Sequence, residues 1–547
     1  MIKLKQRHFN FQTGFFRYWT LLLFLAFTLP VFPQEQDFIN AQLIDSQTKE
    51  PVIFATIRIK DLARGVISNT DGGFKIPNSF KTLGNVLIIS SMGYKSREIL
   101  ISELSSIDLN FIQLDARIFE LSEAVVKAKR KRKLSAEEIV RRAIEAIPRN
   151  FPTNSFSTIG YYRDYQLDEN SYVNLNEAIL EVYDQGFYEL DQETTKVKIY
   201  DYKVNYDFKR DTLAQQPYDY TSKRKTIDKA YLFNYGGNEF TILRIHDAIR
   251  NYKIDSYAYV HRLDTDLLNN HYFSKESETL LDDDVLYTIK FRKTYPGFSA
   301  LGRLFISKRD YAIHKMEYAV YDLWSRKMDK KQKKRGNNKQ LIFKIIVEYQ
   351  KVDDLMYLNY ISFQNRFQLF SSPFMVTDII PDFIEKRFKV KFNNRPYGEV
   401  AQIRGNYRVM YKGKELTLTK IAVRDNTVLL YPDLDLGGAH EMFKEIDKVS
   451  NIKKIGPEVL NFEFAKEIID VKGHNLNDGV YKEYNQFREF FVQEVKPNVK
   501  SPVDSLFMEK RKPIFKDQPI IKPDNFNDYW MNTPLQNIKT KGNSGDN

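Results

Sequence analysis

Short runs of β-branched and aromatic residues, broken by turn residues, constrain the fold of this chain more than any other feature. Between residues 38 and 114 the runs are followed by turns such as Asp71-Gly72-Gly73 and Pro77-Asn78. Strands of this length with Asp-Gly and Pro-Asn punctuation favour an antiparallel β-sandwich of about seven strands. Apolar and polar residues alternate over residues 56–60, so that strand should bury Ile57 and Ile59 and expose the basic residues beside them.

The turn and core residues of this segment also form a recognisable pattern. They are Asp45, Thr48, Pro51 and Ala55, then Gly65, Asp71, Gly73 and Phe74, then Gly93 and Tyr94. This pattern resembles the carboxypeptidase-regulatory-like domain, a transthyretin-like (prealbumin-like) sandwich found in exported envelope proteins of Bacteroidetes. The resemblance covers residues 36–115 and implies a non-catalytic accessory module.

A helix should open the next domain, after a strand and a basic linker over residues 116–134. Ser135 and Glu138 have the spacing of a capping box, in which the serine hydroxyl accepts a hydrogen bond from the backbone N–H of the glutamate. Apolar residues at helical spacing follow, so we expect about three helical turns, ending near Pro148 and Pro152.

Beyond residue 150 the chain indicates a large antiparallel β-rich domain that reaches residue 495. Residues 301–307 and 312–321 should form one hairpin. The other expected strands are 161–167, 172–183, 196–206, 286–293, 341–350, 355–370 and 388–392. Half-open sheets of this kind commonly hold an apolar ligand or receive a partner strand. The fold class is therefore mainly β: a seven-stranded sandwich, a short helix and a large β domain.

Several phrases in this β domain look like those of uncharacterised Bacteroidetes envelope proteins that join the same sandwich to a β-rich domain. They include residues 160–165, 302–306, 357–360 and 488–494. The resemblance implies no known activity. A proline-rich arm, residues 496–547, follows; its aromatic residues predict contact with the body or a partner, and its tip should be disordered.

The N-terminus has the composition of a signal peptide. Residues 1–33 contain four Lys or Arg and no acid, with an apolar run from Tyr18 to Phe32 that Pro30 interrupts. The run is shorter than the ~20 residues that a spanning helix needs, so we predict cleavage near Gln34 rather than a membrane anchor. The chain has no cysteine, which excludes disulfides, thiolate metal sites and a lipid-bearing lipobox. We expect an exported protein, periplasmic or associated with the outer membrane, that is not a lipoprotein.

Two basic runs carry much of the formal net charge of +12, which removal of the first 33 residues would lower by four to +8. The runs are Lys127, Lys129, Arg130, Lys131, Arg132 and Lys133, and Arg326, Lys327, Lys330, Lys331, Lys333, Lys334 and Arg335. They are interpreted as a solvated linker and a solvated loop, or as surfaces that contact anionic lipid or lipopolysaccharide. Export argues against nucleic acid as a partner; an envelope or outer-membrane protein is the expected one.

One spacing in the chain suggests metal chemistry. His314-Lys-Met-Glu317, with His440 or His474 as a third ligand, has the His-x-x-Glu pattern of zinc carboxypeptidases. A strand period of two places His314 and Glu317 on opposite faces unless a bulge intervenes. The acidic stretches at 282–284 and 433–435 are better interpreted as solvated turns than as calcium loops.

No nucleophile elbow or phosphate-binding glycine loop is present in the sequence. We therefore predict no catalytic residue, no metal and no cofactor. The predicted function is that of a non-catalytic exported envelope protein that acts by binding or assembly through its sandwich and its sheet. The alternatives are a metal-dependent hydrolase that uses His314, and a β domain embedded in the outer membrane.

Overall fold

The computed structural model describes residues 37–535 except 63, 118–132, 169–170, 219–220, 222–223, 228–236, 254–262, 282–283, 324–339, 371–372, 436–437, 449–454, 479–480 and 504. The predicted signal peptide, most of the basic linker and the tip of the arm lie outside these residues. The chain divides into two compact units. The sandwich unit contains the described residues up to 117, with 279–284 and 532–535, and the sheet unit contains the rest. Among the described residues, no helix is long and apolar enough to cross a membrane.

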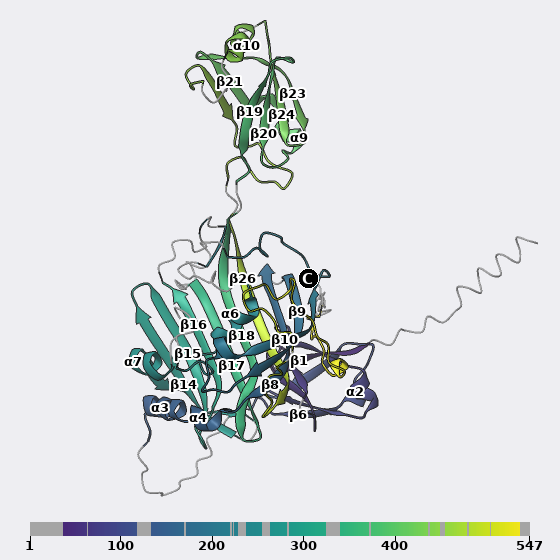
Figure 1. The fold of residues 1–547 in the computed structure, drawn as a ribbon, viewed down its shortest axis with the longest axis vertical. Coiled ribbons are helices and arrows are strands. Elements are labelled where there is room, and N and C mark those ends of the chain that lie inside the picture. Colours follow the sequence, from purple (N-terminus) through teal and green to yellow (C-terminus); the bar gives the residue numbers. More distant parts are fainter. Residues whose placement is uncertain are drawn as a thin grey trace, which may run out of the picture. The chain divides into compact units, whose positions relative to one another are not determined.

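The sandwich unit confirms the predicted seven strands in two sheets (Figure 1). One sheet has the order β4-β1-β7 and the other β3-β2-β5-β6. The strands are β1 (Phe38–Asp45), β2 (Thr56–Ile59), β3 (Gly65–Ile67), β4 (Gly73–Pro77), β5 (Val86–Ser90), β6 (Arg97–Leu100) and β7 (Asn110–Leu114). As predicted, Ile57 and Ile59 are buried and Arg58 is not. A short helix α2 (Ser79–Thr82), a 3₁₀ turn η1 (Ile101–Glu103) and the short strand β13 (Thr279–Leu281) complete the unit.

One expectation for the sandwich is wrong, because its strands are not all antiparallel. β7 pairs with β1 in parallel register, with Ala41 opposite Asn110 and Asp45 opposite Leu114. A parallel neighbour requires a connection that carries the chain back across the strand direction. Here β6 ends in the other sheet, and residues 101–109 cross to the β1 sheet before β7 begins. The sequence alternation predicts which side chains are buried but gives no sign of this direction.

A residue from the end of the chain is part of the sandwich unit. Asn532 is almost fully buried there, with its side-chain oxygen accepting from the backbone N–H of Lys75 at 2.9 Å. Its amide nitrogen donates to the carbonyl oxygen of Ile67, also at 2.9 Å. The predicted C-terminal arm is thus an ordered structural element at this point, since it supplies hydrogen bonds to β3 and β4.

The sheet unit is built on one long sheet with the strand order β10-β9-β8-β26-β18-β17-β16-β15-β14-β12. These strands are β8 (Phe156–Asp168), β9 (Ser171–Asp184), β10 (Lys196–Val204), β12 (Tyr272–Lys275), β14 (Asp284–Tyr295), β15 (Phe298–Ser307), β16 (Ile313–Asp322), β17 (Gln340–Val352), β18 (Leu355–Phe370) and β26 (Tyr481–Lys496). A short β11 (Lys225–Thr226) pairs with β18. The meander from β14 to β18 is confirmed, and Figure 1 shows its strands side by side.

The remaining elements of the sheet unit are mostly short. They are α3 (Ala136–Glu145), α4 (Ile147–Asn150), α5 (Asp191–Thr194), α6 (Glu239–Ile245), the π-helix η3 (Leu263–Leu267), α7 (Leu268–Asn270) and η6 (Phe526–Asp528). Helix α3 starts as predicted, because the Ser135 hydroxyl accepts from the Glu138 N–H at 3.0 Å. The carboxylate of Glu138 does not complete the box and pairs with Arg142 instead, at 2.9 Å.

Residues between β18 and β26 form two further sheets around a hydrophobic core of their own, which the sequence does not predict. One sheet is β19-β20-β24-β23 and the other β22-β21-β25. Their bounds are β19 (Val376–Asp382), β20 (Arg387–Phe392), β21 (Tyr407–Tyr411), β22 (Lys414–Glu415), β23 (Leu418–Arg424), β24 (Thr427–Pro432) and β25 (Leu460–Phe464), with α9 (Gly398–Ala401), η4 (Arg404–Asn406) and α10 (Ala439–Asp447). In sequence these strands resemble those of the long sheet, so alternation alone could not separate them.

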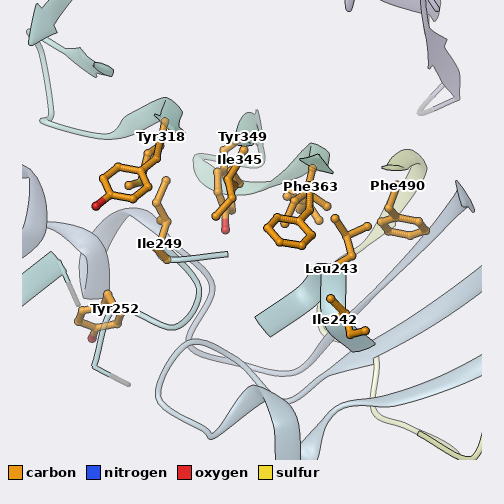
Figure 2. Close-up of a cluster of buried hydrophobic side chains, with 14 of the residues drawn as sticks. Ile242, Leu243, Ile249, Tyr252, Tyr318, Ile345, Tyr349, Phe363 and Phe490 are labelled. Atoms are coloured by element: carbon orange, nitrogen blue, oxygen red, sulfur yellow. The ribbon is translucent and has the colours of Figure 1, made fainter. Parts of the chain in front are cut away.

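The core of the sheet unit lies on the face of the long sheet that α6 covers. Figure 2 shows Tyr318, Ile345 and Phe363 of the sheet directed toward Leu243 and Ile249 of α6 and the segment after it. Asn238 caps this helix, since its side-chain oxygen accepts from the N–H of Thr241 at 2.9 Å. A helix this short is not stable alone. Packing of its apolar face against the sheet and its N-cap therefore hold α6 in place.

A buried ion network fastens the segment after α6 to β9. Arg250 makes a bidentate pair with Asp184, with both N–H···O distances 3.0 Å. Arg244 joins Asp184 at 3.0 Å and Asp191 at 2.5 Å. The hydroxyl of Tyr349 in β17 donates to Asp247 at 2.5 Å. Because each charge has a partner, the network avoids most of the penalty for burying charges.

Two glycines in the long sheet are required by aromatic rings that cover them. A Cβ on Gly302 would lie 2.2 Å from Cζ of Phe291, its cross-strand neighbour, and 2.5 Å from the carbonyl oxygen of Glu317. A Cβ on Gly160 would lie 2.7 Å from Cζ of the Phe490 ring and 2.4 Å from the carbonyl oxygen of Phe491. Rings over strand glycines are a known device for pinning strand register.

We predict that Gly302→Ala lowers the free energy of unfolding by about 2 kcal/mol, because the added methyl group overpacks a sheet that cannot move aside. The matched control is Gly405→Ala, where a Cβ would meet no atom within 4 Å and the change should stay within about 1 kcal/mol. Urea unfolding of both variants measures the difference. Equal effects of the two substitutions would show that the ring does not restrict Gly302.

Candidate ligand-binding cavity

Most of the basic residues singled out in the sequence lie outside the described residues. Lys133 is the exception, and it is exposed just before α3. The other members of the first run, Lys127 to Arg132, and the whole second run, Arg326 to Arg335, fall in the ranges 118–132 and 324–339. A role for these residues in surface binding therefore stays a prediction.

The structure places a β-bulge at His314, the first of the suspected metal ligands. The pairing of β15 with β16 skips His314, since Phe305 faces Lys315 and Ile306 faces Ile313. Glu317 forms ion pairs with Lys315 at 3.3 Å and with Arg303 at 3.8 Å. Among the residues that the structure describes, no three His, Cys, Asp or Glu side chains form a group that could hold a metal ion.

A cavity of about 620 Å³ opens in the sheet unit near the ends of β8, β9 and β26. Four other segments contribute to its wall: the loop 206–217, the start of β11, the start of α6, and residues 513–516 of the C-terminal arm. The volume lies within the ~300–1,000 Å³ typical of small-molecule sites. The expectation that a half-open sheet holds an apolar ligand does not locate this cavity or predict its polar wall.

Amide side chains line the β8 and β26 wall of the cavity. Gln166 donates to the side-chain oxygen of Gln486 at 2.5 Å and accepts from Asn174 at 2.7 Å. Asn174 adopts a left-handed backbone conformation, φ 56°, where the β8–β9 pairing is irregular. Asparagine tolerates this conformation better than most residues, and a bulge re-aims its side chain. Its side-chain oxygen also accepts from the N–H of Asp211, which holds the 206–217 loop.

On the same wall, Asn176 forms hydrogen bonds with both Arg210 and Asp164. One guanidinium nitrogen of Arg210 donates to the side-chain oxygen of Asn176 at 3.0 Å, and another donates to the carbonyl oxygen of Leu175 at 2.9 Å. The amide nitrogen of Asn176 donates to Asp164 at 2.8 Å. Burial, with the charge of Glu239 adding to it, raises the pKa of Asp164 to about 7.

Arg488 of β26 connects the cavity to the core. Its guanidinium is fully buried and pairs with Glu239, the first residue of α6. It also donates to the side-chain oxygen of Asn365 in β18 at 2.5 Å and to the hydroxyl of Tyr218 at 3.1 Å. Burial disfavours the charge, but Glu239 outweighs it and raises the pKa of Arg488. Both carboxylates of the cavity wall, Asp164 and Glu239, are thus set in a network of hydrogen bonds.

Lys225 is a second buried cation in the wall. Its ammonium donates to the carbonyl oxygen of Ala214 at 2.7 Å and lies 4.7 Å and 4.4 Å from the ring centroids of Tyr218 and Phe367. Burial lowers the pKa of Lys225 to about 8, and the two rings stabilise the cation that remains. At neutral pH this side chain is mainly a positive charge at the edge of the cavity.

The C-terminal arm provides the apolar part of the wall. The ring of Phe515 stacks on Tyr162 with centroids 6.2 Å apart and meets Tyr202 edge-on at 5.9 Å. Asn238 holds the arm in place, since its amide donates to the carbonyl oxygen of Lys512 at 2.9 Å. The prediction that aromatic residues of the arm contact the body is therefore correct for Phe515.

The cavity residues could be recognised only in part from sequence. Arg163-Asp164 and Arg488-Glu489 are charged pairs flanked by aromatic residues, which is a signal for buried ion pairs. Lys225 and Arg210 lie in a stretch without clear hydrophobic periodicity, so the local sequence does not predict that they line a cavity. What the arrangement offers chemically is a set of fixed donors, acceptors and positive charges beside an aromatic ring.

Comparison with known proteins supports the module assignment for the first unit. Residues 39–126 match the family model of the CarboxypepD_reg-like domain. A search of curated proteins finds no match. A solved DUF1329 family protein from Desulfovibrio piger matches over 43% of this chain and 87% of its own, at 11% identity and a TM-score of 0.19. At that score the likeness informs neither fold nor function.

We predict that Asp164→Asn changes how stability depends on pH. The pKa of Asp164 is higher in the folded chain, about 7, than its ordinary value of 3.8, so the folded state favours the proton. The wild-type chain should therefore lose stability as pH rises from about 4 to 7, by up to roughly 4 kcal/mol from this group. Asparagine mimics the protonated acid and removes the loss.

Urea unfolding of both proteins from pH 4 to pH 8 measures this effect. The stability of the Asn variant relative to wild type should increase across the range. Asp168→Asn is the control, because Asp168 is half-buried at the end of β8 and pairs with Lys209 and Lys482, which lower its pKa. Its variant should show no such increase. A constant difference between Asp164→Asn and wild type would contradict the prediction.

Proposed function

We propose that this chain is an exported, non-catalytic binding protein of the cell envelope, which holds a small polar ligand in the cavity of its sheet unit. The observation that carries the proposal is the cavity itself. It has the volume of a ligand site, and its polar side chains are oriented by hydrogen bonds to one another and to the backbone. Such pre-oriented groups bind a ligand with little loss of side-chain entropy.

The sandwich unit fits this proposal as an accessory module. Its match to the CarboxypepD_reg-like domain covers 39–126, and the resemblance of that segment implies an accessory role rather than catalysis. The signal-like residues 1–33 and the absence of cysteine support export to the periplasm or the outer membrane without a lipid anchor. A protein partner in the envelope is the expected one for the sandwich.

Occupation of the cavity by a ligand can be tested with a blocking variant. Thr212 is exposed and lines the cavity, whereas its neighbour Leu213 is exposed and does not. Thr212→Trp should fill the opening, and Leu213→Trp should leave it free. Purified proteins are incubated with the small-molecule fraction of an envelope extract, washed and denatured, and the released compounds are identified by mass spectrometry.

We expect wild type and Leu213→Trp to release a compound that Thr212→Trp does not retain. A correctly folded Thr212→Trp protein, checked by circular dichroism, is needed for that comparison. Equal recovery from all three proteins, or recovery of no compound from wild type, would contradict a ligand site in this cavity.

If the chain is exported, its mature form should lack the signal peptide, residues 1–33. When the full sequence is expressed in a Gram-negative host, N-terminal sequencing should find a mature end near residue 34 in the periplasmic or outer-membrane fraction. A variant that lacks residues 1–33 should stay in the cytosol. An uncut chain in the inner membrane would instead show that residues 18–32 are an anchor.

A further inference from the structure

We infer that the cavity binds an acidic sugar, that is, a ring with several hydroxyl groups and one carboxylate. This inference rests on the proposed function and assigns its ligand class. It follows from three features of the wall: its amides, its charges and its aromatic side chain.

The amide groups fit hydroxyl groups. Five Asn and Gln side chains line the cavity: Gln166, Asn174, Asn176, Gln215 and Gln486. A carboxamide donates two hydrogen bonds and accepts two, and a hydroxyl group also donates and accepts. The bonds between Gln166, Asn174 and Gln486 use part of this capacity and fix the orientation of the rest. Such a surface can bind neighbouring hydroxyl groups of a ring as donor and acceptor together.

The charges of the wall favour an anion. Lys225, Arg210 and Lys516 line the cavity as cations, and Asp164 and Glu239 as acids. Glu239 is neutralised by Arg488 behind the wall. The burial that raises the pKa of Asp164 to about 7 removes part of its negative charge at neutral pH. The wall therefore has an excess of positive charge.

Arg210 is the residue best placed to bind the carboxylate. Its guanidinium is held by Asn176 and by the carbonyl oxygen of Leu175, so it is already oriented before a ligand arrives. A planar guanidinium binds a carboxylate through charge-assisted hydrogen bonds, which are stronger than neutral ones. Phe515, on the arm, offers the apolar face against which the C–H groups of a sugar ring pack.

The amides and the positive charges together distinguish an acidic sugar from a neutral sugar and from an anion without hydroxyl groups. A neutral sugar would use the amides but bring no negative charge to balance the cations of the wall. An anion without hydroxyl groups on a ring would use the charges and leave the amides unmatched. A matched pair of probes tests both points: methyl β-D-glucuronide and methyl β-D-glucoside, which differ only in the oxidation state of one carbon, with tricarballylate as the anion without hydroxyl groups.

Binding to the full chain is measured by isothermal titration calorimetry. We expect the glucuronide to bind at least about tenfold more tightly than the glucoside and tricarballylate, as one charge-assisted contact predicts. Arg210→Gln should weaken glucuronide binding by about tenfold or more. The control is Lys209→Gln, since Lys209 pairs with Asp168 and does not line this cavity; it should change binding by less than about twofold.

Three results would overturn the inference. They are equal affinity for glucuronide and glucoside, affinity for tricarballylate equal to that for glucuronide, and no binding of glucuronide at all. In each case the Thr212→Trp comparison with the envelope extract decides whether the proposed function still stands. If wild type retains an extract compound that Thr212→Trp does not, the cavity binds another ligand class and the proposed function stands. If no compound is retained either, the proposed function fails as well.

Discussion

Arg488 carries a charge that is fully buried in the middle of the long sheet, and the structure around it provides the partners that such a charge requires. An unpaired buried charge costs several kcal/mol, so Glu239, Asn365 and Tyr218 must all be in place when β26 is. These partners come from the start of α6, from β18 and from the loop before β11. One guanidinium therefore fixes the helix over the sheet and shapes one wall of the cavity.

Glu489, the residue after Arg488, is a second buried charge with its partners on the opposite face of the sheet. Successive side chains of a strand point to opposite sides, and Glu489 forms a buried pair with Arg163 of β8 at 2.6 Å. The hydroxyl of Tyr360 in β18 donates to the same carboxylate at 3.0 Å. β26 is thus held to β8 by an ion pair and to β18 by side-chain hydrogen bonds of Arg488 and Glu489, in addition to the backbone ladder.

The high tyrosine content has an explanation in these contacts. Either packing or glycan stacking could account for 34 Tyr and 40 Phe in the sequence, and the described rings are largely buried in the sheet cores. Several tyrosines also satisfy buried acids: Tyr161 donates to Glu177 at 2.7 Å, and Tyr200 donates to Glu181 at 2.6 Å. Phenylalanine would fill the same volume but remove one hydrogen-bond donor from each of these buried carboxylates.

Local signals in the sequence were sufficient for much of the secondary structure and insufficient for the site. Ser135 predicts the start of α3, and alternation predicts which residues of β2 are buried, because both effects act over a few residues. The parallel direction of β7, the separate core of residues 374–476 and the position of β26 depend on which strand pairs with which. The cavity depends on the same information: it combines Asp164, Lys225 and Phe515, which are brought together only by the complete sheet and the arm.

The place of β26 also determines when the sheet can be completed. β8, β9 and β10 precede the meander in the chain, yet they reach it only through β26, whose residues are 481–496. While the chain is being synthesised from its N-terminus, the three-stranded part and the meander therefore remain two separate sheets with exposed edges. Pairings over such long sequence separations form slowly, and exposed edges can pair with other chains. A chain with this topology has to be kept from aggregating until β26 has been synthesised.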